Sequence, residues 1–343
     1  MKAVVINKHG GRDVLEYTDI ETPKPKANEV LVKIHACALN HLDIWLRKGL
    51  PGLKLDFPHI LGSDIAGEVA DFGELVTDLK KGEKVLLNTN TSCEHCEHCL
   101  SGNDVLCRQY SILGTVKNGG YAEYISVSRQ NILPFPKDLS MAEAASIPLT
   151  FLTAWNMLVN RAKIKPGETV LVLAAGSGVG SAAVQIAKLF NTTVIATAST
   201  EKKLKLAKAL GADHLINYEK TDFSKEVQKL TNKKGVDVVF EHVGKATWEK
   251  SMLSVREEGR IVTCGATTGF DPITDLRHVF YRQIQILGNK MGPKASLFEI
   301  LRFFDQKKLK PVVDRTLPLK DAQEAHRVME DREQFGKIVL EMK

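Results

Sequence analysis

Residues 169–190 read TVLVLAAGSGVGSAAVQIAKLF and contain the most informative pattern in the chain. The apolar run 169–173 has the length and the β-branched content of a buried strand, and 181–190 has the apolar spacing of an amphipathic helix. Between them, 174–180 carry only small side chains, so the backbone can turn sharply there. This stretch therefore predicts a strand, a tight turn and a helix in immediate succession.

The same strand and helix alternation continues toward residue 290. Short apolar segments alternate with amphipathic ones, as in units whose parallel strands are joined by crossover helices. We expect strands at 169–173, 193–197, 214–217, 236–240, 260–264 and 283–287, and helices at 181–190, 201–210, 223–231 and 246–255. The fold class is α/β, and residues 150–290 are predicted to form a six-stranded, doubly wound parallel sheet of the Rossmann type.

The glycine-rich turn predicts that this sheet binds a dinucleotide. Glycines at the start of a helix let backbone N–H groups approach a pyrophosphate. A strict G-x-G-x-x-G pattern from Gly176 would need glycine at Ser181, so the motif is informative only together with the strand before it and the helix after it. A glycine turn that merely connects a strand to a close-packed helix is the alternative. Expected cofactor contacts are Ala175, Gly176, Ser177, Gly178, Val179 and Gly180, with Val243 and Gly265 after later strands.

The end of the second expected strand bears on the choice between NAD and NADP. NAD-binding sheets place a carboxylate there for the ribose 2′-hydroxyl. This chain has Ala198 at that point, followed by Ser199, Thr200, Glu201, Lys202 and Lys203. Hydroxyls and ammonium groups suit a 2′-phosphate, so we predict NADP(H), with Ser199 as a donor. Lys202 and Lys203 as merely solvated residues at a helix start are the alternative.

Four cysteines, Cys93, Cys96, Cys99 and Cys107, follow C-x2-C-x2-C-x7-C spacing. Four thiolates complete a tetrahedral zinc site and leave no position for substrate, so we predict one structural Zn²⁺ per chain. An iron–sulfur cluster is the alternative, but the bacterial run ends with three intervening residues and a proline, and here seven intervene. The site belongs to a lobe at about 88–110.

The first part of the chain has short β-type runs at 3–6, 30–36, 65–72, 84–87 and 121–127, separated by glycine-containing turns. This pattern is typical of an antiparallel, barrel-like β domain. The closing segment, with two expected helices and a final strand-like run at 336–340, has its simplest packing partner in this domain. We therefore assign 1–149 and 291–343 to one domain and 150–290 to the other.

Composition narrows the function classes. The 343 residues are 43% hydrophobic and 26% charged, with a formal net charge of +6 spread along the chain. The lack of a basic block argues against a nucleic-acid partner. The start has no signal-peptide pattern, and no run approaches the roughly 18 apolar residues of a membrane span. We expect a cytoplasmic protein with a small-molecule substrate and no membrane partner.

Four further segments carry a resemblance to a known family. They are 32–43 (VKIHACALNHLD), 61–67 (LGSDIAG), 119–123 (GGYAE) and 147–155 (IPLTFLTAW). With the cysteine lobe and the nucleotide fold, the chain resembles the medium-chain dehydrogenase/reductase superfamily from end to end, and its quinone oxidoreductase branch most. The resemblance implies a GroES-like catalytic domain beside the Rossmann domain, and a homo-dimer or homo-tetramer joined through the last sheet strand. It also implies 2′-phosphate contacts from Lys203 and Tyr218.

The resemblance also implies a missing metal site. Zinc alcohol dehydrogenases have a cysteine at the position of Asn40, a His-Glu pair at Ser63-Asp64 and a third ligand near Leu149. Asparagine, serine and leucine do not hold a catalytic zinc, so only the structural zinc is expected. An unorthodox site built from His41, Asp43, His59 and Asp64 is the alternative. Many quinone oxidoreductases lack the cysteine lobe that this chain has, and Trp45 replaces a tyrosine proposed as proton donor in some relatives.

We therefore expect NADPH-dependent hydride transfer to a quinone or an α,β-unsaturated carbonyl without a catalytic metal. The resemblance places Asn40 in the nicotinamide pocket. Thr153 is a candidate for holding the carboxamide or an ordinary helix hydroxyl. His41 is a candidate proton relay, a candidate contact to the pyrophosphate, or an exposed residue. The alternatives are a zinc-type alcohol dehydrogenase with substituted ligands and a non-enzymatic NADPH-binding protein, as in relatives recruited as crystallins.

Overall fold

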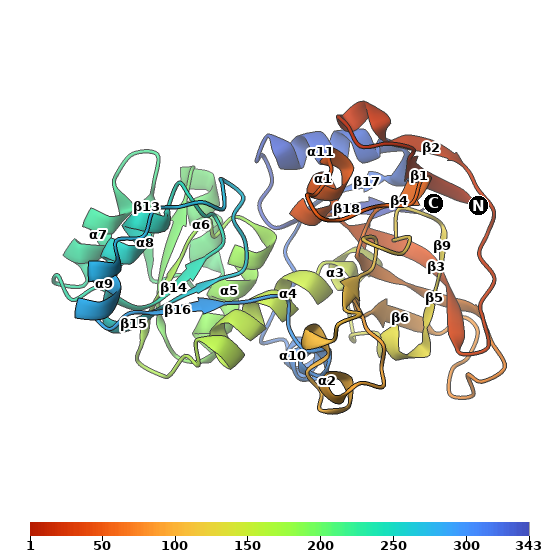
Figure 1. Cartoon of the computed structure of the whole chain (residues 1–343), viewed down its shortest axis with the longest axis horizontal. Coiled ribbons are helices and arrows are strands. Elements are labelled where there is room, and N and C mark those ends of the chain that lie inside the picture. Colours follow the sequence, from red (N-terminus) through yellow and green to blue (C-terminus); the bar gives the residue numbers. More distant parts are fainter. Residues whose placement is uncertain (343) are drawn as a thin grey trace. The chain divides into compact units, whose positions relative to one another are not determined.

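The computed structural model describes residues 1–342 and divides into two compact units. Unit 1 contains Met1–Leu149 and Pro293–Lys343, and unit 2 contains Thr150–Gly292. The last strand of the chain, β18 (Lys337–Glu341), pairs with β3 (Glu29–Ala38), so the C-terminal segment completes the first unit (Figure 1). Among residues 1–342, no helix has the length and apolar character needed to cross a bilayer.

Unit 1 is a β structure with short helices. Its largest sheet has the order β10-β6-β5-β3-β18-β17, and β9 also pairs with β3. The remaining strands form a sheet of order β2-β1-β4 and the pair β7-β8. The other strands are β1 (Lys2–Ile6), β2 (Glu16–Asp19), β4 (His59–Ile60), β5 (Asp64–Phe72), β6 (Lys84–Leu87), β7 (Asn90–Thr91), β8 (Ser111–Ile112), β9 (Tyr124–Ser128), β10 (Ile132–Pro134) and β17 (Val313–Pro318).

Short helices join these strands and cover the sheet. Helix α11 packs on β18 and β17, and α3 packs on β3 and β5. The helices are α1 (His41–Lys48), α2 (Glu97–Leu100), α3 (Met141–Ala145), α10 (Ala295–Asp305), α11 (Ala322–Glu330) and the 3-10 turns η1 (Arg12–Val14), η2 (Asp104–Leu106), η3 (Arg129–Asn131) and η5 (Leu319–Asp321). Helix α4 (Pro148–Trp155) crosses the division between the units.

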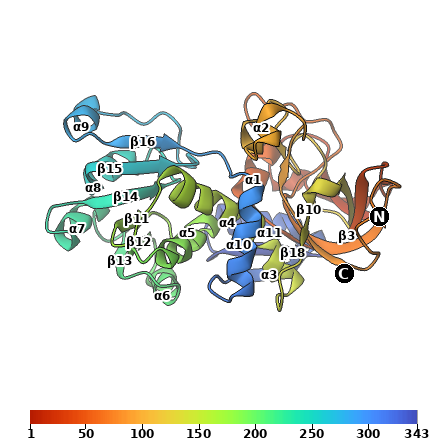
Figure 2. The same cartoon turned by 90° about the horizontal axis from the view of Figure 1, so that it is seen from below.

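Unit 2 is built on the parallel sheet expected from the sequence. Its order β13-β12-β11-β14-β15-β16 is that of a doubly wound nucleotide-binding sheet (Figure 2). Helix α5 packs on β11 and β12, and α8 packs on β14 and β15. The strands are β11 (Thr169–Val172), β12 (Thr193–Ala198), β13 (His214–Asn217), β14 (Val236–Glu241), β15 (Val255–Thr263) and β16 (Gln285–Gly288). The helices are α5 (Gly178–Leu189), α6 (Glu201–Ala209), α7 (Phe223–Leu230), α8 (Trp248–Ser254), α9 (Leu276–Tyr281) and the π-helical turn η4 (Asn156–Arg161).

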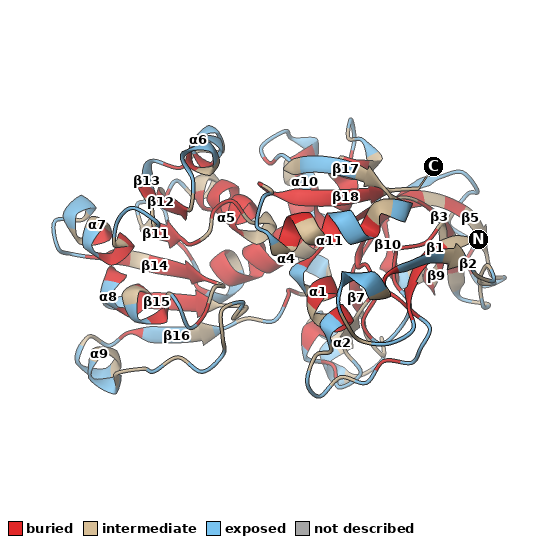
Figure 3. Cartoon of the chain, turned by 90° about the horizontal axis from the view of Figure 1, so that it is seen from above, coloured by how far each residue is buried: buried red, intermediate tan, exposed pale blue. Residues whose placement is uncertain are grey.

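Burial explains why the central strands read as continuous apolar runs. Strands β11 and β14 are covered on both faces, and their apolar residues have almost no exposed surface (Figure 3). The edge strand β16 and helix α9 are largely exposed in the same view. An edge strand of this kind can pair with an additional strand.

Several elements differ from the sequence expectation. The helix expected at 246–255 is shorter, because α8 ends at Ser254, and β15 begins at Val255, five residues before the expected strand at 260–264. Helix α5 begins at Gly178, three residues before the expected start, because the Ser177 side chain caps it by accepting from the Gly180 N–H at 2.9 Å. The strand expected at 121–127 is shorter, since β9 begins at Tyr124. Residues 121–123 bond instead to β1 and to Leu61. Just before them, Gly119 approaches the 60–62 segment so closely that a Cβ would lie 2.2 Å from Gly62 O.

Candidate functional site

Three neighbouring strands of unit 1 bring Asn40, Asp64 and Lys337 together. In the antiparallel ladders, Ala38 of β3 is paired with Asp64 of β5 on one side and with Val339 of β18 on the other. Continuing the second register by two residues places Lys337 opposite Asn40. Residues far apart in the sequence are thus held together by sheet geometry, and we call Asn40, Asp64 and Lys337 the Asn40 cluster.

The Asn40 cluster is closed by direct polar contacts. Lys337 Nζ donates to Asn40 Oδ1 at 2.6 Å and to Asp64 Oδ2 at 2.8 Å. Asn40 Nδ2 donates to the same Asp64 Oδ2 at 3.0 Å. The side chains of Lys337 and Asp64 are 4% and 0% exposed, so this ion pair is shielded from water. Little water screens the attraction between an ammonium group and a carboxylate buried in this way.

The positions beside the cluster complete its surroundings. The backbone N–H of Leu149 donates to Asp64 Oδ1 at 2.8 Å, so both oxygens of this carboxylate are engaged. Ser63 directly precedes β5, and its Oγ is fully buried with no hydrogen-bond partner among the described residues. An unpartnered buried hydroxyl is costly, and a polar ligand reaching Ser63 would relieve that cost.

Behind the Asn40 cluster runs a chain of buried polar groups. Asp43 Oδ2 accepts from the Asn40 backbone N–H at 2.8 Å and from Tyr121 Oη at 3.1 Å. His326 Nε2 lies 3.2 Å from Tyr121 Oη, and its Nδ1 lies 3.0 Å from Arg47 Nη1. We call Asp43, Tyr121, His326 and Arg47 the polar chain; it ends where Arg47 Nη2 donates to Glu330 Oε1 at 2.7 Å.

Burial shifts the ionisation of several of these groups. It raises the pKa of Asp43 to about 6, against the opposing hydrogen bond from Asn40 and the charge of Lys337. It also raises the pKa of Tyr121 well above its ordinary value. For His326, burial and then the charge of Arg47 lower the pKa to about 3, so this ring is neutral at physiological pH. The polar chain therefore carries its positive charge on Arg47 alone.

The cysteine lobe has the geometry of a structural metal site. The Sγ atoms of Cys93, Cys96, Cys99 and Cys107 all lie within 4.8 Å of one another, and Cys96 Sγ is 3.5 Å from Cys99 Sγ. A tetrahedral zinc with Zn–S bonds of about 2.3 Å needs sulfur–sulfur separations of about 3.8 Å. Backbone N–H groups of Cys93 and Gln109 point at Cys107 Sγ, as they do toward thiolates. The four residues fit zinc, and His95 and His98 are exposed beside them.

Within residues 1–342, this cysteine group is the one set of three or more His, Cys, Asp or Glu side chains whose ligand atoms converge. The unorthodox site considered from the sequence is therefore not formed. His59 Nε2 is hydrogen-bonded to Gly114 O at 3.0 Å, and the Asp43 oxygens are occupied by Asn40, Gly62 and Tyr121.

In unit 2, the expected cofactor contacts lie at the carboxyl ends of the parallel strands. The glycine turn follows β11 and is held against β12, because the Ala175 N–H donates to Thr197 O at 2.9 Å. Ser177 caps the Gly180 N–H, which leaves the N–H groups of Gly178 and Val179 without an acceptor inside the helix. A Cβ on Gly180 would lie 2.4 Å from Ala174 O, so the turn requires glycine there. These features fit a pyrophosphate.

The other expected contacts follow neighbouring strands at the same edge. Ser199 follows β12, Tyr218 follows β13, Val243 follows β14 and Gly265 follows β15. The Tyr218 N–H donates to Ala198 O, which joins the ends of β12 and β13. Ligands of doubly wound sheets bind at this edge.

The end of β12 carries no carboxylate at its last residue, Ala198. The nearest acid in the sequence, Glu201, is exposed and already accepts from Asn217 Nδ2 at 3.0 Å and from Lys220 Nζ at 2.9 Å. Lys203 lies in the first turn of α6, whose N-cap Thr200 accepts from the Lys203 N–H. The local charge at this strand end is therefore dominated by lysines.

The two other predicted catalytic residues have ordinary environments. His41 is exposed at the start of α1, and its ring packs edge-on against Trp45 with centroids 5.0 Å apart. Thr153 is buried in α4, and its hydroxyl donates to Met291 Sδ at 3.3 Å.

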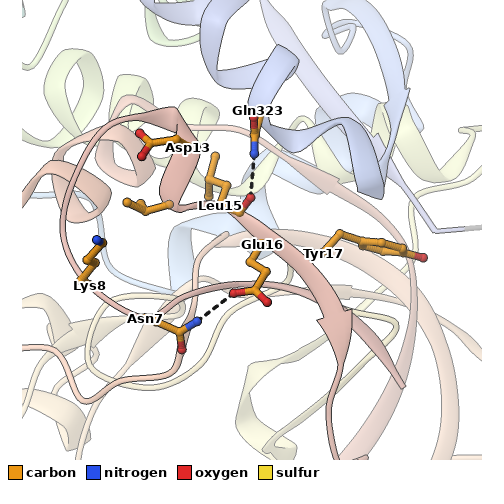
Figure 4. Close-up of a pocket in the computed structure, with 8 residues that line it drawn as sticks. Asn7, Lys8, Asp13, Leu15, Glu16, Tyr17 and Gln323 are labelled. Atoms are coloured by element: carbon orange, nitrogen blue, oxygen red, sulfur yellow. Dashed lines mark hydrogen bonds between the residues drawn. The ribbon is translucent and has the colours of Figure 1, made fainter.

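A surface hollow in unit 1 lies beside η1 and β2 (Figure 4). Three of its polar side chains, those of Asn7, Glu16 and Gln323, are hydrogen-bonded to neighbouring groups. Asn7 Nδ2 donates to Glu16 Oε2 at 3.0 Å, and Gln323 Nε2 donates to Leu15 O at 3.0 Å. The hollow contains none of the Asn40 cluster or polar-chain residues, and we assign no function to it.

Comparison with known proteins decides the family. Residues 26–137 match the alcohol dehydrogenase GroES-like domain, and residues 178–306 match the zinc-binding dehydrogenase domain. A zinc-type alcohol dehydrogenase-like protein of Schizosaccharomyces pombe is 33% identical, and the alignment covers 100% of this chain and 99% of that protein. The chain is a medium-chain dehydrogenase/reductase. Both the superfamily and the fold class expected from the sequence are thereby confirmed.

Relatives of this dehydrogenase/reductase carry different activity names. A solved structure described as an NAD-dependent alcohol dehydrogenase is 50% identical, with a TM-score of 0.97 and 100% coverage of both chains. The human quinone oxidoreductase is 28% identical, and the alignment covers 99% of this chain and 97% of that protein. The protein is thus an oxidoreductase of the medium-chain family.

Sequence reasoning missed Lys337, Tyr121 and His326 as parts of a site. A lysine at the start of a strand ordinarily lies in solvent, and Lys337 is separated from Asp64 by 273 residues. The one available signal was the position of Lys337 inside an otherwise apolar run, 336–340.

Proposed function

We propose that this medium-chain oxidoreductase transfers hydride from NADPH to a quinone or an α,β-unsaturated carbonyl without a metal at the reacting carbon. The observation that carries the proposal is the Asn40 cluster. By the family resemblance, Asn40, Ser63-Asp64 and Leu149 occupy the positions that hold catalytic zinc in alcohol dehydrogenases. In this chain both Asp64 oxygens and the Asn40 carboxamide oxygen are already engaged by protein donors.

The chemistry of the donors supports the same conclusion. A zinc ion needs three protein ligands beside its substrate, and imidazole, thiolate and free carboxylate oxygens serve best. Here an ammonium group, Lys337 Nζ, lies within 2.8 Å of the candidate carboxylate. A second cation at this place would be repelled by Lys337 and would have to displace it.

The kind of acceptor follows from the missing Lewis acid. Hydride addition to a saturated ketone concentrates negative charge on one oxygen, and a metal ion supplies several kcal/mol toward that charge. A quinone or enone spreads the incoming electron pair over a conjugated system, so hydrogen-bond donors suffice. The reduced nicotinamide supplies the hydride when bound, and water supplies the balancing proton.

The residues of this chain would then bind and orient. We assign to the Asn40 carboxamide a hydrogen bond to the acceptor oxygen, and to the glycine turn 175–180 the pyrophosphate. Val243 and Gly265 would line the cofactor at the ends of their strands. Thr153 remains a candidate for the nicotinamide carboxamide, and His41 a candidate for proton exchange with water.

NADP(H) is the proposed cofactor, although a 50%-identical relative is described as NAD-dependent. The residues around the end of β12 support this choice. The strand ends in Ala198, and the nearby Glu201 is paired with Lys220. Ser199, Lys203 and Tyr218 offer donors for a phosphate. A carboxylate that accepts from the 2′-hydroxyl of NAD is missing from the last residue of β12.

The second candidate function is an NAD-dependent alcohol dehydrogenase. The name of the 50%-identical structure favours it. On that reading the Asn40 cluster would have to rearrange to admit a metal, or alcohol oxidation would have to proceed without one.

We also propose a homo-dimer or homo-tetramer that uses the exposed edge of unit 2. Edge strand β16 exposes Ile286 (41%), and helix α9 exposes Leu276 and Phe280 nearby in the sequence. An unpaired strand with apolar side chains is suited to pair with a second copy.

The experiment is a steady-state survey of the purified protein. NADPH oxidation would be followed with 1,4-naphthoquinone and cyclohex-2-enone, and NAD(P)⁺ reduction with ethanol and benzyl alcohol. Turnover of the first pair with NADPH supports the proposal. Turnover of the alcohols alone supports the alcohol dehydrogenase, and tight NADPH binding without turnover of any of the four supports a non-enzymatic role.

A further inference from the structure

We propose that Lys337 is a positioning residue that acts through Asn40. Together with Asp64, it holds the Asn40 carboxamide in one of its two possible orientations and presents one N–H to the electron acceptor. The inference rests on the proposed function for the identity of that acceptor. The orientation itself follows from contacts within unit 1.

The donor and acceptor capacities of the three side chains determine the orientation. An ammonium group only donates, so the atom of Asn40 facing Lys337 must be the carbonyl oxygen. A carboxylate only accepts, so the atom facing Asp64 must be the amide nitrogen. Rotating the carboxamide by half a turn would set N–H against an ammonium and oxygen against a carboxylate. Both contacts would become repulsive in a buried, low-dielectric place.

The backbone of Asn40 is held as firmly as its side chain. Its N–H donates to Asp43 at 2.8 Å, and Asp43 is in turn bonded to Tyr121 and to the Gly62 N–H. Asn40 also follows directly after β3, whose ladder with β18 carries Lys337. Both the backbone of Asn40 and its carboxamide group are therefore held in place by hydrogen bonds.

This arrangement leaves one hydrogen of Asn40 Nδ2 for a ligand. The first N–H is committed to Asp64 at 3.0 Å, and the second approaches only Ala38 O at 3.5 Å, which is the long limit of a hydrogen bond. Asn40 retains 6% exposure, whereas Asp64 has none. The ammonium on Oδ1 also withdraws electron density from the amide, which strengthens its N–H as a donor. Lys337 thus orients the Asn40 carboxamide and also makes its N–H a stronger hydrogen-bond donor.

The test is a mutant cycle in which the buried ion pair is removed as a unit. Replacing Lys337 alone would leave the Asp64 charge buried without its partner, so the variant is Lys337→Met with Asp64→Asn, which removes both charges of the pair. The cycle compares wild type, this pair-removed protein, Asn40→Leu, and all three substitutions together. The readout is kcat/KM for 1,4-naphthoquinone with NADPH. As a control, each variant should bind NADPH with a Kd within about twofold of wild type, which shows that unit 2 is intact.

Removal of the pair should lower kcat/KM by about 10- to 100-fold when Asn40 is present, mainly through kcat. In the Asn40→Leu background the same removal should change kcat/KM by less than about twofold, because Lys337 then has nothing to position. Lys337→Arg with Asp64 retained should recover part of the activity. An equal loss in both backgrounds, or no loss beside Asn40, would overturn the proposal.

A spectroscopic measurement separates this inference from the proposed reaction. In protein labelled with ¹⁵N-asparagine, the Asn40 side-chain signals are those lost in Asn40→Leu. They should be two well-separated, slowly exchanging amide protons in wild type, and they should exchange rapidly in the pair-removed protein. If naphthoquinone and cyclohexenone are not reduced, the proposed function fails and this result alone decides the role of Lys337. Unchanged exchange after pair removal would refute it.

Discussion

The hydroxyl of Tyr121 lies 3.1 Å from Asp43 Oδ2, inside unit 1 and away from water. The direction of this bond follows from its neighbours. Arg47 only donates, so His326 Nδ1 accepts and Nε2 carries the hydrogen that is donated to Tyr121. Tyr121 must then donate to Asp43. A protonated Asp43 would disturb this order, because its own hydrogen would face other donors.

The burial of Asp43 predicts an unusual dependence of stability on pH, because burial raises its pKa more than the hydrogen bonds from Asn40 and Tyr121 and the charge of Lys337 lower it. The folded-state pKa of Asp43 is about 6, above the roughly 3.9 of an unfolded aspartate. The folded protein therefore holds this proton more tightly, and the contribution of Asp43 to the free energy of unfolding falls as pH rises from about 4 to 6. The fall should be about 2–3 kcal/mol.

Urea unfolding of wild type and Asp43→Asn at several pH values checks this prediction. The difference in free energy of unfolding between wild type and Asp43→Asn should change in that pH window and become constant above about pH 7, where Asp43 is mostly ionised in both the folded and the unfolded state. A constant difference from pH 4 to 8 would show that Asp43 has an ordinary pKa.

Lys203→Ala should weaken NADPH binding by about tenfold and NADH binding by less than twofold, because only NADPH presents a 2′-phosphate. Calorimetric titration of the two cofactors measures both values. Lys205→Ala is the matched control, since Lys205 is an exposed lysine of the same helix α6. Equal losses for NADPH and NADH in Lys203→Ala would refute the cofactor proposal.

Cys96→Ser should remove zinc from the lobe and loosen it without abolishing hydride transfer. The lobe is tied to the start of α10 because Asp104 Oδ1 accepts from the Lys294 N–H at 2.8 Å. Amide hydrogen exchange should therefore increase at 93–110 and near 294. Cys264→Ser, outside the cluster, should retain its zinc and its exchange pattern. Complete loss of turnover in folded Cys96→Ser protein would contradict a purely structural role.

Ile286→Lys should shift the protein toward monomers in light-scattering chromatography, because it places a charge on the edge strand β16. The control is Leu215→Lys on the opposite edge strand, β13, where Leu215 is 37% exposed. Unchanged mass in Ile286→Lys, or an equal shift in both variants, would argue against assembly through β16.

Local patterns carried enough information for the parallel sheet and the cysteine site. Strand β11, the glycine turn and α5 are contiguous in the sequence, and the four cysteines lie within fifteen residues. The Asn40 cluster was not predictable in this way, because it depends on the pairing of β18 with β3 and of β3 with β5. The polar chain also joins α1 to α11 across the sequence, and a buried histidine such as His326 has no local signature.

The most direct test of a metal-free reaction centre is metal content measured together with turnover. Protein purified and dialysed against a mild chelator should retain one zinc per chain, in the four-cysteine site, and should reduce 1,4-naphthoquinone with NADPH at an undiminished rate. Two zinc ions per chain, with turnover lost as the second is removed, would contradict the account and favour a zinc-dependent alcohol dehydrogenase.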